Sequence, residues 1–146
     1  MAEQRYIKPT AFETYFNRIV GLLTKLGLSL MGSRVLAVKG RTSGQWRTTP
    51  VNLLTVDGAR YLVAPRGQAQ WVRNIRVAGG GELRLGRKVE PFTVTELADA
   101  DKPPVIRAYL KRWGWEVGKF FEGLDKNAGD EQIAAVAPGF PVFRIN

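Results

Sequence analysis

The chain has 146 residues, of which 45% are hydrophobic and 24% charged, as expected of one globular domain. It contains neither cysteine nor histidine, which excludes disulfides, thiolate nucleophiles, imidazole bases and zinc sites of the usual Cys/His kind. The net charge is +9, and residues 39–76 alone contribute +6, because they hold seven Lys and Arg residues and one acid, Asp57. Such concentrated charge predicts a polyanionic ligand, which leaves open a phosphorylated cofactor, nucleic acid or an anionic membrane surface; a solvated basic face is the alternative.

The N-terminal segment predicts an amphipathic helix. Apolar side chains recur every three or four residues from Lys8 to about Met31, and Gly32 and Ser33 end the pattern. We assign residues 1–31 to this helix and residues 32–146 to the rest of the same single domain. The apolar face suits core packing, a cover over a substrate mouth, or contact with a membrane interface that holds a hydrophobic acceptor. No run reaches the ~18 apolar residues of a membrane span and the first ten residues are polar, so we expect a cytoplasmic protein, with peripheral membrane contact as the variant.

The remaining chain alternates short strand patterns with helical ones. In chain order the predicted elements are strands at Arg34–Lys39, Trp46–Val56 and Arg60–Ala64, a helix at Gln68–Ala78, strands at Glu82–Leu85 and Lys88–Leu97, a helix from Asp101 to about Phe121, a short helix at Asp130–Ala137 and a strand at Pro141–Ile145. Asp57-Gly58 is a strong hairpin signal, and Pro91 marks a bulge or an edge. Tight turns favour antiparallel pairing, so about six strands predict an α+β fold, a small closed or nearly closed barrel with helices packed outside.

Two segments carry the polar groups that suit a ligand. Gly40–Pro50 offers two guanidiniums, four hydroxyls and two glycines in a strand-loop-strand unit, which suits phosphate or carboxylate binding but also a hairpin whose hydroxyls cap its own turns. In Ala64–Asn74 a strand ends in a glycine turn that leads into a helix N-terminus, where anions bind well. Trp71 and Asn74 are three residues apart and share a helix face, so they address one ligand together, or else Trp71 is core and Asn74 is surface.

These two motifs, in this order and with a hairpin between them, resemble the deazaflavin-dependent nitroreductase family, the coenzyme F420 oxidoreductases of actinobacteria. The matching patterns are Gly-Arg-Thr-Ser-Gly-x-x-Arg-Thr-Thr-Pro and Ala-Pro-Arg-Gly…Trp-x-x-Asn, and the resemblance runs from about Gly27 to Phe143. It implies a split β-barrel, in agreement with the strand order. It also implies the 8-hydroxy-5-deazaflavin cofactor, whose phospholactyl and oligoglutamate tail is multiply anionic and suits the basic segment.

The resemblance also implies roles for individual residues. By the family pattern, the residues that face the cofactor's tail and phosphate are Arg41, Thr42, Ser43 and Arg47; those that border its ring system are Thr49, Pro50 and Val51; those that complete the groove are Ala64, Pro65, Arg66, Gly67, Trp71 and Asn74. The substrate-pocket candidates are Asn52, Tyr109 and Trp115. Asn52 replaces an aromatic residue of some members, and Trp115 lies off the main apolar stripe of its helix. Tyr109 is a candidate proton donor, although its place on the apolar helix face is also typical of a core residue.

The sequence therefore predicts an F420-dependent oxidoreductase that transfers a hydride to a small hydrophobic acceptor, namely a quinone-like compound, an enone or a nitro compound. No catalytic side chain and no metal are assigned, because hydride transfer needs orientation rather than a protein nucleophile. Two alternatives remain, an FMN-binding reductase on the same fold and a small basic barrel that binds nucleic acid with Trp46 and Trp71 as stacking platforms. Confinement of the charge to one ligand-sized unit favours a compact anion, so no nucleic-acid partner is expected. The oligomeric state is not predicted.

Overall fold

The computed structural model describes residues 33–117 and 128–146, and for residue 33 and residues 113–117 it describes the backbone alone. The predicted N-terminal helix and the end of the predicted long helix lie outside these residues. The described strands are β1 (Ser33–Lys39), β2 (Trp46–Asn52), β3 (Leu54–Val56), β4 (Ala59–Val63), β5 (Gly80–Leu85), β6 (Lys88–Glu96) and β7 (Val142–Ile145). The helices are α2 (Gln70–Ala78), η1 (Asp99–Asp101), α3 (Pro103–Val117), α4 (Asp130–Val136) and η3 (Ala137–Gly139).

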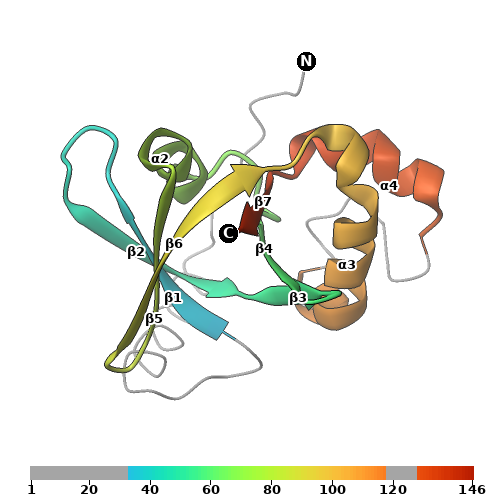
Figure 1. Cartoon of the computed structure of the whole chain (residues 1–146). Helices are drawn as coiled ribbons and strands as arrows, with labels where there is room; N and C mark the ends of the chain where they lie inside the picture. The colour runs from blue at the N-terminus through green and yellow to red at the C-terminus, as the bar shows by residue number, and fades with distance from the viewer. Residues whose placement is uncertain (1–32, 118–127) are drawn as a thin grey trace.

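The strands form one antiparallel sheet that curls into a half-barrel (Figure 1), which confirms the predicted α+β class. Its order is β2-β1-β5-β6-β7-β4-β3, so β2 and β3 lie at opposite ends although only Leu53 separates them along the chain. The sheet must therefore bend until its two edges approach each other. The described chain has seven strands instead of the expected six, because the predicted strand Trp46–Val56 breaks at Leu53, where it passes from one edge to the other.

Strand β6 joins the two halves of the curled sheet. Its residues 88–93 pair with β5, and its residues 94–96 pair with β7. Pro91 lies opposite Glu82 of β5, and among the described strands it has no partner on its other side. This agrees with the predicted edge position, where a residue without a backbone N–H is tolerated.

The predicted hairpin turn at Asp57-Gly58 is confirmed. Val56 pairs with Ala59, and the two residues between them have φ angles of 49° and 82°. A two-residue turn with both φ angles positive matches the right-handed twist of the flanking strands, and Asp-Gly suits it because glycine has no Cβ to clash. A purely local signal thus fixes the β3–β4 register.

Two apolar clusters fill the described structure. One lies where α2 covers the curled sheet and includes Leu36, Val38, Ile75 and Phe143. The other lies where α3 and α4 pack beside β3 and β4, on the opposite side of the molecule in Figure 1. Beside the second cluster, the buried Lys102 donates to the Ala137 carbonyl at 3.1 Å and pairs with Asp99 at 2.7 Å, which ties η1 to η3. No helix in the described residues is long and apolar enough to span a membrane.

Candidate functional site

The two predicted ligand segments meet at a buried amide. Asn74 of α2 is 5% exposed, and its Oδ1 accepts two hydrogen bonds from Arg41 in the β1–β2 loop. One comes from the Arg41 backbone N–H at 3.1 Å and the other from its Nη1 at 2.7 Å. Arg41 Nη2 also donates to Gln70 Oε1 at 3.0 Å. The structure therefore brings the loop and the helix together, and it uses Arg41, predicted as a tail contact, to join them.

The orientation of the Asn74 amide follows from its donors. A guanidinium and a backbone N–H can only donate, so the atom that faces them must be the amide oxygen, and the NH2 group must face elsewhere. No residue in the described part of the chain accepts a hydrogen bond from this NH2 group. A buried donor without an acceptor is unfavourable and uncommon. The alternative that placed Asn74 at the surface is therefore wrong, because the side chain is buried.

The β1–β2 loop is held largely by its own bonds. The Gly40 N–H donates to the Gln45 carbonyl at 2.8 Å, and the Gly44 N–H to the Gly40 carbonyl at 2.9 Å. The Gln45 N–H donates to Ser43 Oγ at 3.2 Å, so the Ser43 hydroxyl caps the turn, as the alternative reading of this motif expected. Thr42 and Ser43 are exposed.

Strand β2 places the residues predicted beside the ring on two faces. Thr49 lies opposite Leu36 and Arg47 opposite Val38, so Arg47, Thr49 and Val51 lie on the face that α2 covers. Pro50 alternates to the other face, and so does Asn52, the substrate-pocket candidate that follows it. The side chains of Thr49, Pro50 and Val51 therefore do not border one ligand from the same side.

Two aromatic residues singled out in the sequence lie on different faces as well. Trp46 is 43% exposed on the face that Pro50 shares, with Lys39 Nζ 5.3 Å and Arg84 Cζ 5.1 Å from its ring centroid. Trp71 is half-buried against the apolar cluster between α2 and the sheet, with its ring centroid 5.8 Å from that of Phe143. The two rings do not form a common stacking platform, which weighs against the nucleic-acid alternative.

The turn after β4 forms as predicted. Ala64 is buried, and its N–H donates to the Pro141 carbonyl at 2.9 Å; its carbonyl accepts from the Gly67 N–H at 3.1 Å. Gly67 has a φ of 87°, which an L side chain rarely adopts. Pro65 and Arg66 are half-buried beside it. The helix begins at residue 70, two residues later than predicted, because residue 69 is still extended.

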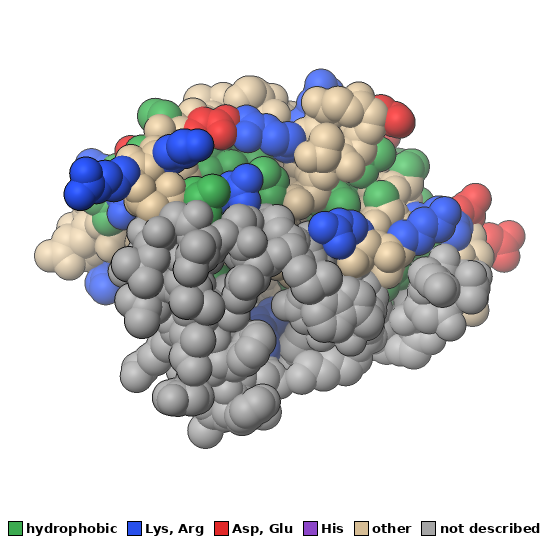
Figure 2. Space-filling view, turned by 90° about the horizontal axis from the view of Figure 1, so that it is seen from below, with side chains coloured by type: hydrophobic (Ala, Val, Ile, Leu, Met, Phe, Trp, Pro, Cys, Tyr) green, Lys and Arg blue, Asp and Glu red, His purple; other side chains and the backbone are tan. Residues whose placement is uncertain are grey.

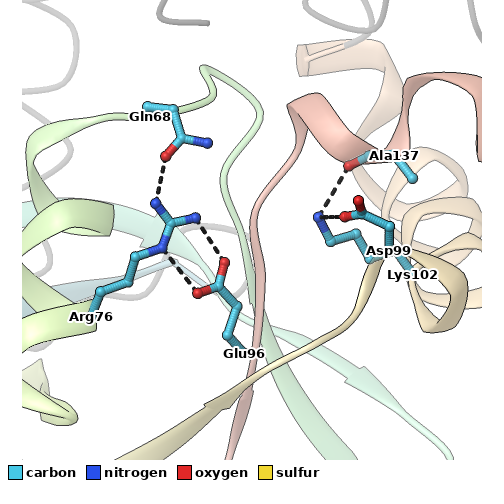
Figure 3. A network of polar contacts seen from close by, with 6 residues as sticks. All are labelled: Gln68, Arg76, Glu96, Asp99, Lys102 and Ala137. Atoms are coloured by element: carbon cyan, nitrogen blue, oxygen red, sulfur yellow. Dashed lines mark hydrogen bonds and ion pairs between the residues drawn. The ribbon is translucent and has the colours of Figure 1, made fainter. Parts of the chain in front are cut away.

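Sequence reasoning missed a second buried amide in this turn. Gln68 is 7% exposed, and its Oε1 accepts from Arg76 Nη1 at 2.5 Å. Arg76 is itself held by Glu96 of β6 through bonds of 2.9 and 2.7 Å (Figure 3). The only signal in the sequence is a polar residue beside a predicted helix start, which is too common to single out.

The remaining pocket candidates lie elsewhere. Tyr109 is 2% exposed within the α3 cluster, which agrees with its interpretation as a core residue. Trp115 lies in α3, but its side chain is outside the described residues. In the described residues no three His, Cys, Asp or Glu side chains gather as a metal site would require.

Acidic residues from β6 neutralise part of the basic segment. Arg60 donates two hydrogen bonds to Glu90, and Arg76 pairs with Glu96. The bonds with Arg60 lower the pKa of Glu90, and the same bonds raise the pKa of the Arg60 guanidinium. Figure 2 shows Lys and Arg side chains beside Asp and Glu at several places on one face. The charge offered to a ligand is therefore smaller than the sequence suggests.

A model of the F420H(2)-dependent quinone reductase family matches residues 13–115. Among solved structures, one called an F420-H2 dependent reductase (FDR-A) is 18% identical with a TM-score of 0.56, covering 79% of this chain and 94% of that chain. A chain described as a domain-swapped dimer is 18% identical with a TM-score of 0.58, covering 88% and 92%. A NimC/NimA family protein from Clostridium acetobutylicum is 15% identical with a TM-score of 0.52, covering 80% and 74%. A comparison with curated proteins found no match. At these identities the solved structures establish the fold alone.

Proposed function

The chain belongs to the family of F420H2-dependent quinone reductases, and from this premise we propose that it binds reduced coenzyme F420 between the β1–β2 loop and α2 and reduces a small quinone-like acceptor. The family match makes it an F420-dependent oxidoreductase. The place of the cofactor and the identity of the acceptor are the proposed part. The match favours coenzyme F420 over FMN.

The Asn74 amide is the observation that carries the proposed binding place. Its oxygen is occupied twice by Arg41, while its buried NH2 group has no acceptor in the part of the chain that the structure describes. A deazaflavin ring carries carbonyl oxygens, which are acceptors of the required kind. The donor left over in the protein and the acceptors offered by the cofactor therefore fit each other.

Arg47 and Arg73 are the cations that we assign to the anionic tail. Arg47 is exposed on the face of β2 that α2 covers, and Arg73 is half-buried in α2. Within the described residues neither has a carboxylate partner, in contrast to Arg60 and Arg76. One guanidinium can donate two parallel hydrogen bonds to two oxygens of a phosphate or carboxylate, which suits the phospholactyl and glutamate groups. Arg41 contributes indirectly, because it holds the loop against the helix.

When bound, the reduced deazaflavin supplies a hydride from one ring carbon. The protein then has to hold donor and acceptor at reacting distance and keep their rings aligned. Trp71, packed on Phe143, provides a fixed apolar wall for this, and Asn74 provides a directional donor. A quinone that accepts a hydride also needs a proton to become a hydroquinone. We assign that proton to solvent, since Tyr109 is buried in the core cluster.

Equilibrium binding of F420 and of FMN to the purified protein, side by side, tests the proposal. We expect tight binding of F420, weak binding of FMN, and F420H2 oxidation that depends on an added quinone such as menadione. Tighter binding of FMN, or F420H2 oxidation that no quinone, enone or nitro compound stimulates, would contradict it. We do not expect the affinity for F420 to fall steeply with salt, because its tail makes only a few ionic contacts, unlike the many phosphates of a nucleic acid.

A further inference from the structure

Gln68 is a second buried amide in the segment assigned to the cofactor. It lies in the turn between β4 and α2, directly after Gly67, and is 7% exposed. Its oxygen accepts a hydrogen bond from Arg76 Nη1. The Nε and Nη2 atoms of the same guanidinium donate to the carboxylate of Glu96. The side chain is thus part of a built network that links the turn, the last part of α2 and the end of β6 (Figure 3).

This network decides which end of the amide is left over. Because arginine only donates, the Gln68 oxygen must face Arg76, and the nitrogen points away from it, as Figure 3 shows. In the described part of the molecule no residue accepts a hydrogen bond from that nitrogen. Buried donors in folded proteins are nearly always paired, so the missing acceptor points to a bound molecule.

We propose that Gln68 is a further ligand-binding residue, whose amide nitrogen donates to a carbonyl oxygen of the deazaflavin ring or of the quinone acceptor. The assignment rests on the proposed function, since both molecules carry carbonyl oxygens and both must lie close together for hydride transfer. A neutral amide suits a neutral carbonyl, whereas the anionic tail is better matched by guanidiniums. Arg76 and Glu96 are positioning residues that act through Gln68.

The Gln68→Glu variant separates the two ends of the side chain. A carboxylate keeps the acceptor that Arg76 binds, but it has no N–H to donate. Gln70→Glu is the matched control, because it adds the same charge two residues away at an exposed side chain that also accepts from an arginine. For each variant the experiment measures the melting temperature, the Kd for F420 and the KM for menadione. Gln68→Met, which is uncharged and of similar length, removes both the donor and the acceptor, and it tests the loss of the donor if the carboxylate unfolds the protein.

We expect Gln68→Glu to melt near the wild type and to weaken one ligand by about tenfold to a hundredfold, while Gln70→Glu changes binding by less than about threefold. A raised Kd for F420 would place the bond on the cofactor, and a raised KM at unchanged Kd would place it on the quinone. Arg76→Ala should weaken the same ligand in the wild type but add little in the Gln68→Glu background, because its effect passes through Gln68. Wild-type protein that binds no F420 would overturn the proposed function and this inference with it. Wild-type binding with unchanged Kd and KM in the folded Gln68 variants would overturn the role of Gln68 alone.

Discussion

Replacing Asn74 tests whether it only joins the loop to the helix or also binds the ligand. In Asn74→Ala, Arg41 loses two bonds, one to its backbone N–H and one to its guanidinium. A neutral bond contributes about 1 kcal/mol and a charged one about 1.5–3 kcal/mol, the latter reduced here because Arg41 is exposed. We therefore expect the free energy of unfolding to fall by about 2–3 kcal/mol. Gln70→Ala, which removes only one exposed bond to the same arginine, should change it by less than about 0.5 kcal/mol.

Asn74→Asp separates the two roles, because a carboxylate accepts both bonds from Arg41 but has no NH2 group to donate. The stronger bond to the guanidinium offsets part of the cost of burying a charge, so we expect the unfolding free energy to change by less than about 1 kcal/mol. The Kd for F420 should nevertheless rise about tenfold or more, since the donor is gone. Urea denaturation and fluorescence titration of F420 measure the two quantities. An aspartate variant that binds F420 as the wild type does would refute the assignment of Asn74 to the cofactor.

Three further predictions concern charge and proton transfer. Arg47→Ala should weaken F420 binding by about 1.5–3 kcal/mol in a titration, with little change in kcat at saturating cofactor. Arg60→Ala should change F420 binding little, because Glu90 already neutralises Arg60. Because the folded-state pKa of Glu90 is lowered, its pairing stabilises the fold above the ordinary glutamate pKa of 4.5 and is lost as the pH falls through the lower folded value. Glu90→Gln should therefore cost less than about 1 kcal/mol at pH 7, and the cost should shrink as the pH is lowered below the ordinary glutamate pKa, which urea denaturation over a series of pH values measures. Tyr109→Phe should keep kcat within about threefold, and a loss of ~10²-fold or more would identify an essential acid.

The features predicted correctly from the sequence are those that local chemistry determines. Asp57-Gly58 needs only its own backbone preferences to make a two-residue turn, and β1 is recognised from its short continuous run of apolar residues, all of them buried. The order of helices and strands follows from such signals, and with it the α+β class, whereas the sheet curls into a half-barrel instead of the closed or nearly closed barrel expected. The break at Leu53 could not be predicted in this way. It depends on which strands pair at the two edges of the sheet, and that is a property of the whole chain.

The candidate site was predictable in its segments but not in its contacts. Arg41 and Asn74 are 33 residues apart, and no spacing rule connects a loop residue to a helix residue at that distance. The pairing of Arg60 with Glu90 likewise brings in an acid from outside the basic segment. Net charge along the sequence therefore overestimates the charge offered to a ligand, because the fold decides which cations are already neutralised.

In the proposed site, the two buried amides would allow a basic segment to recognise a neutral ring. A guanidinium binds any nearby oxygen and favours anions, so arginines alone would select the charged tail over the ring. An amide that accepts from arginine through its oxygen still has two N–H donors to offer, whereas a carboxylate in the same place would have none. In both Gln68 and Asn74 an arginine donates to the amide oxygen and holds the side chain in place, and we propose that the amide nitrogen donates to the ligand. Replacing either amide by its acid should therefore preserve the fold and remove the ligand contact, which makes the two substitutions the sharpest test of how this site orients its cofactor.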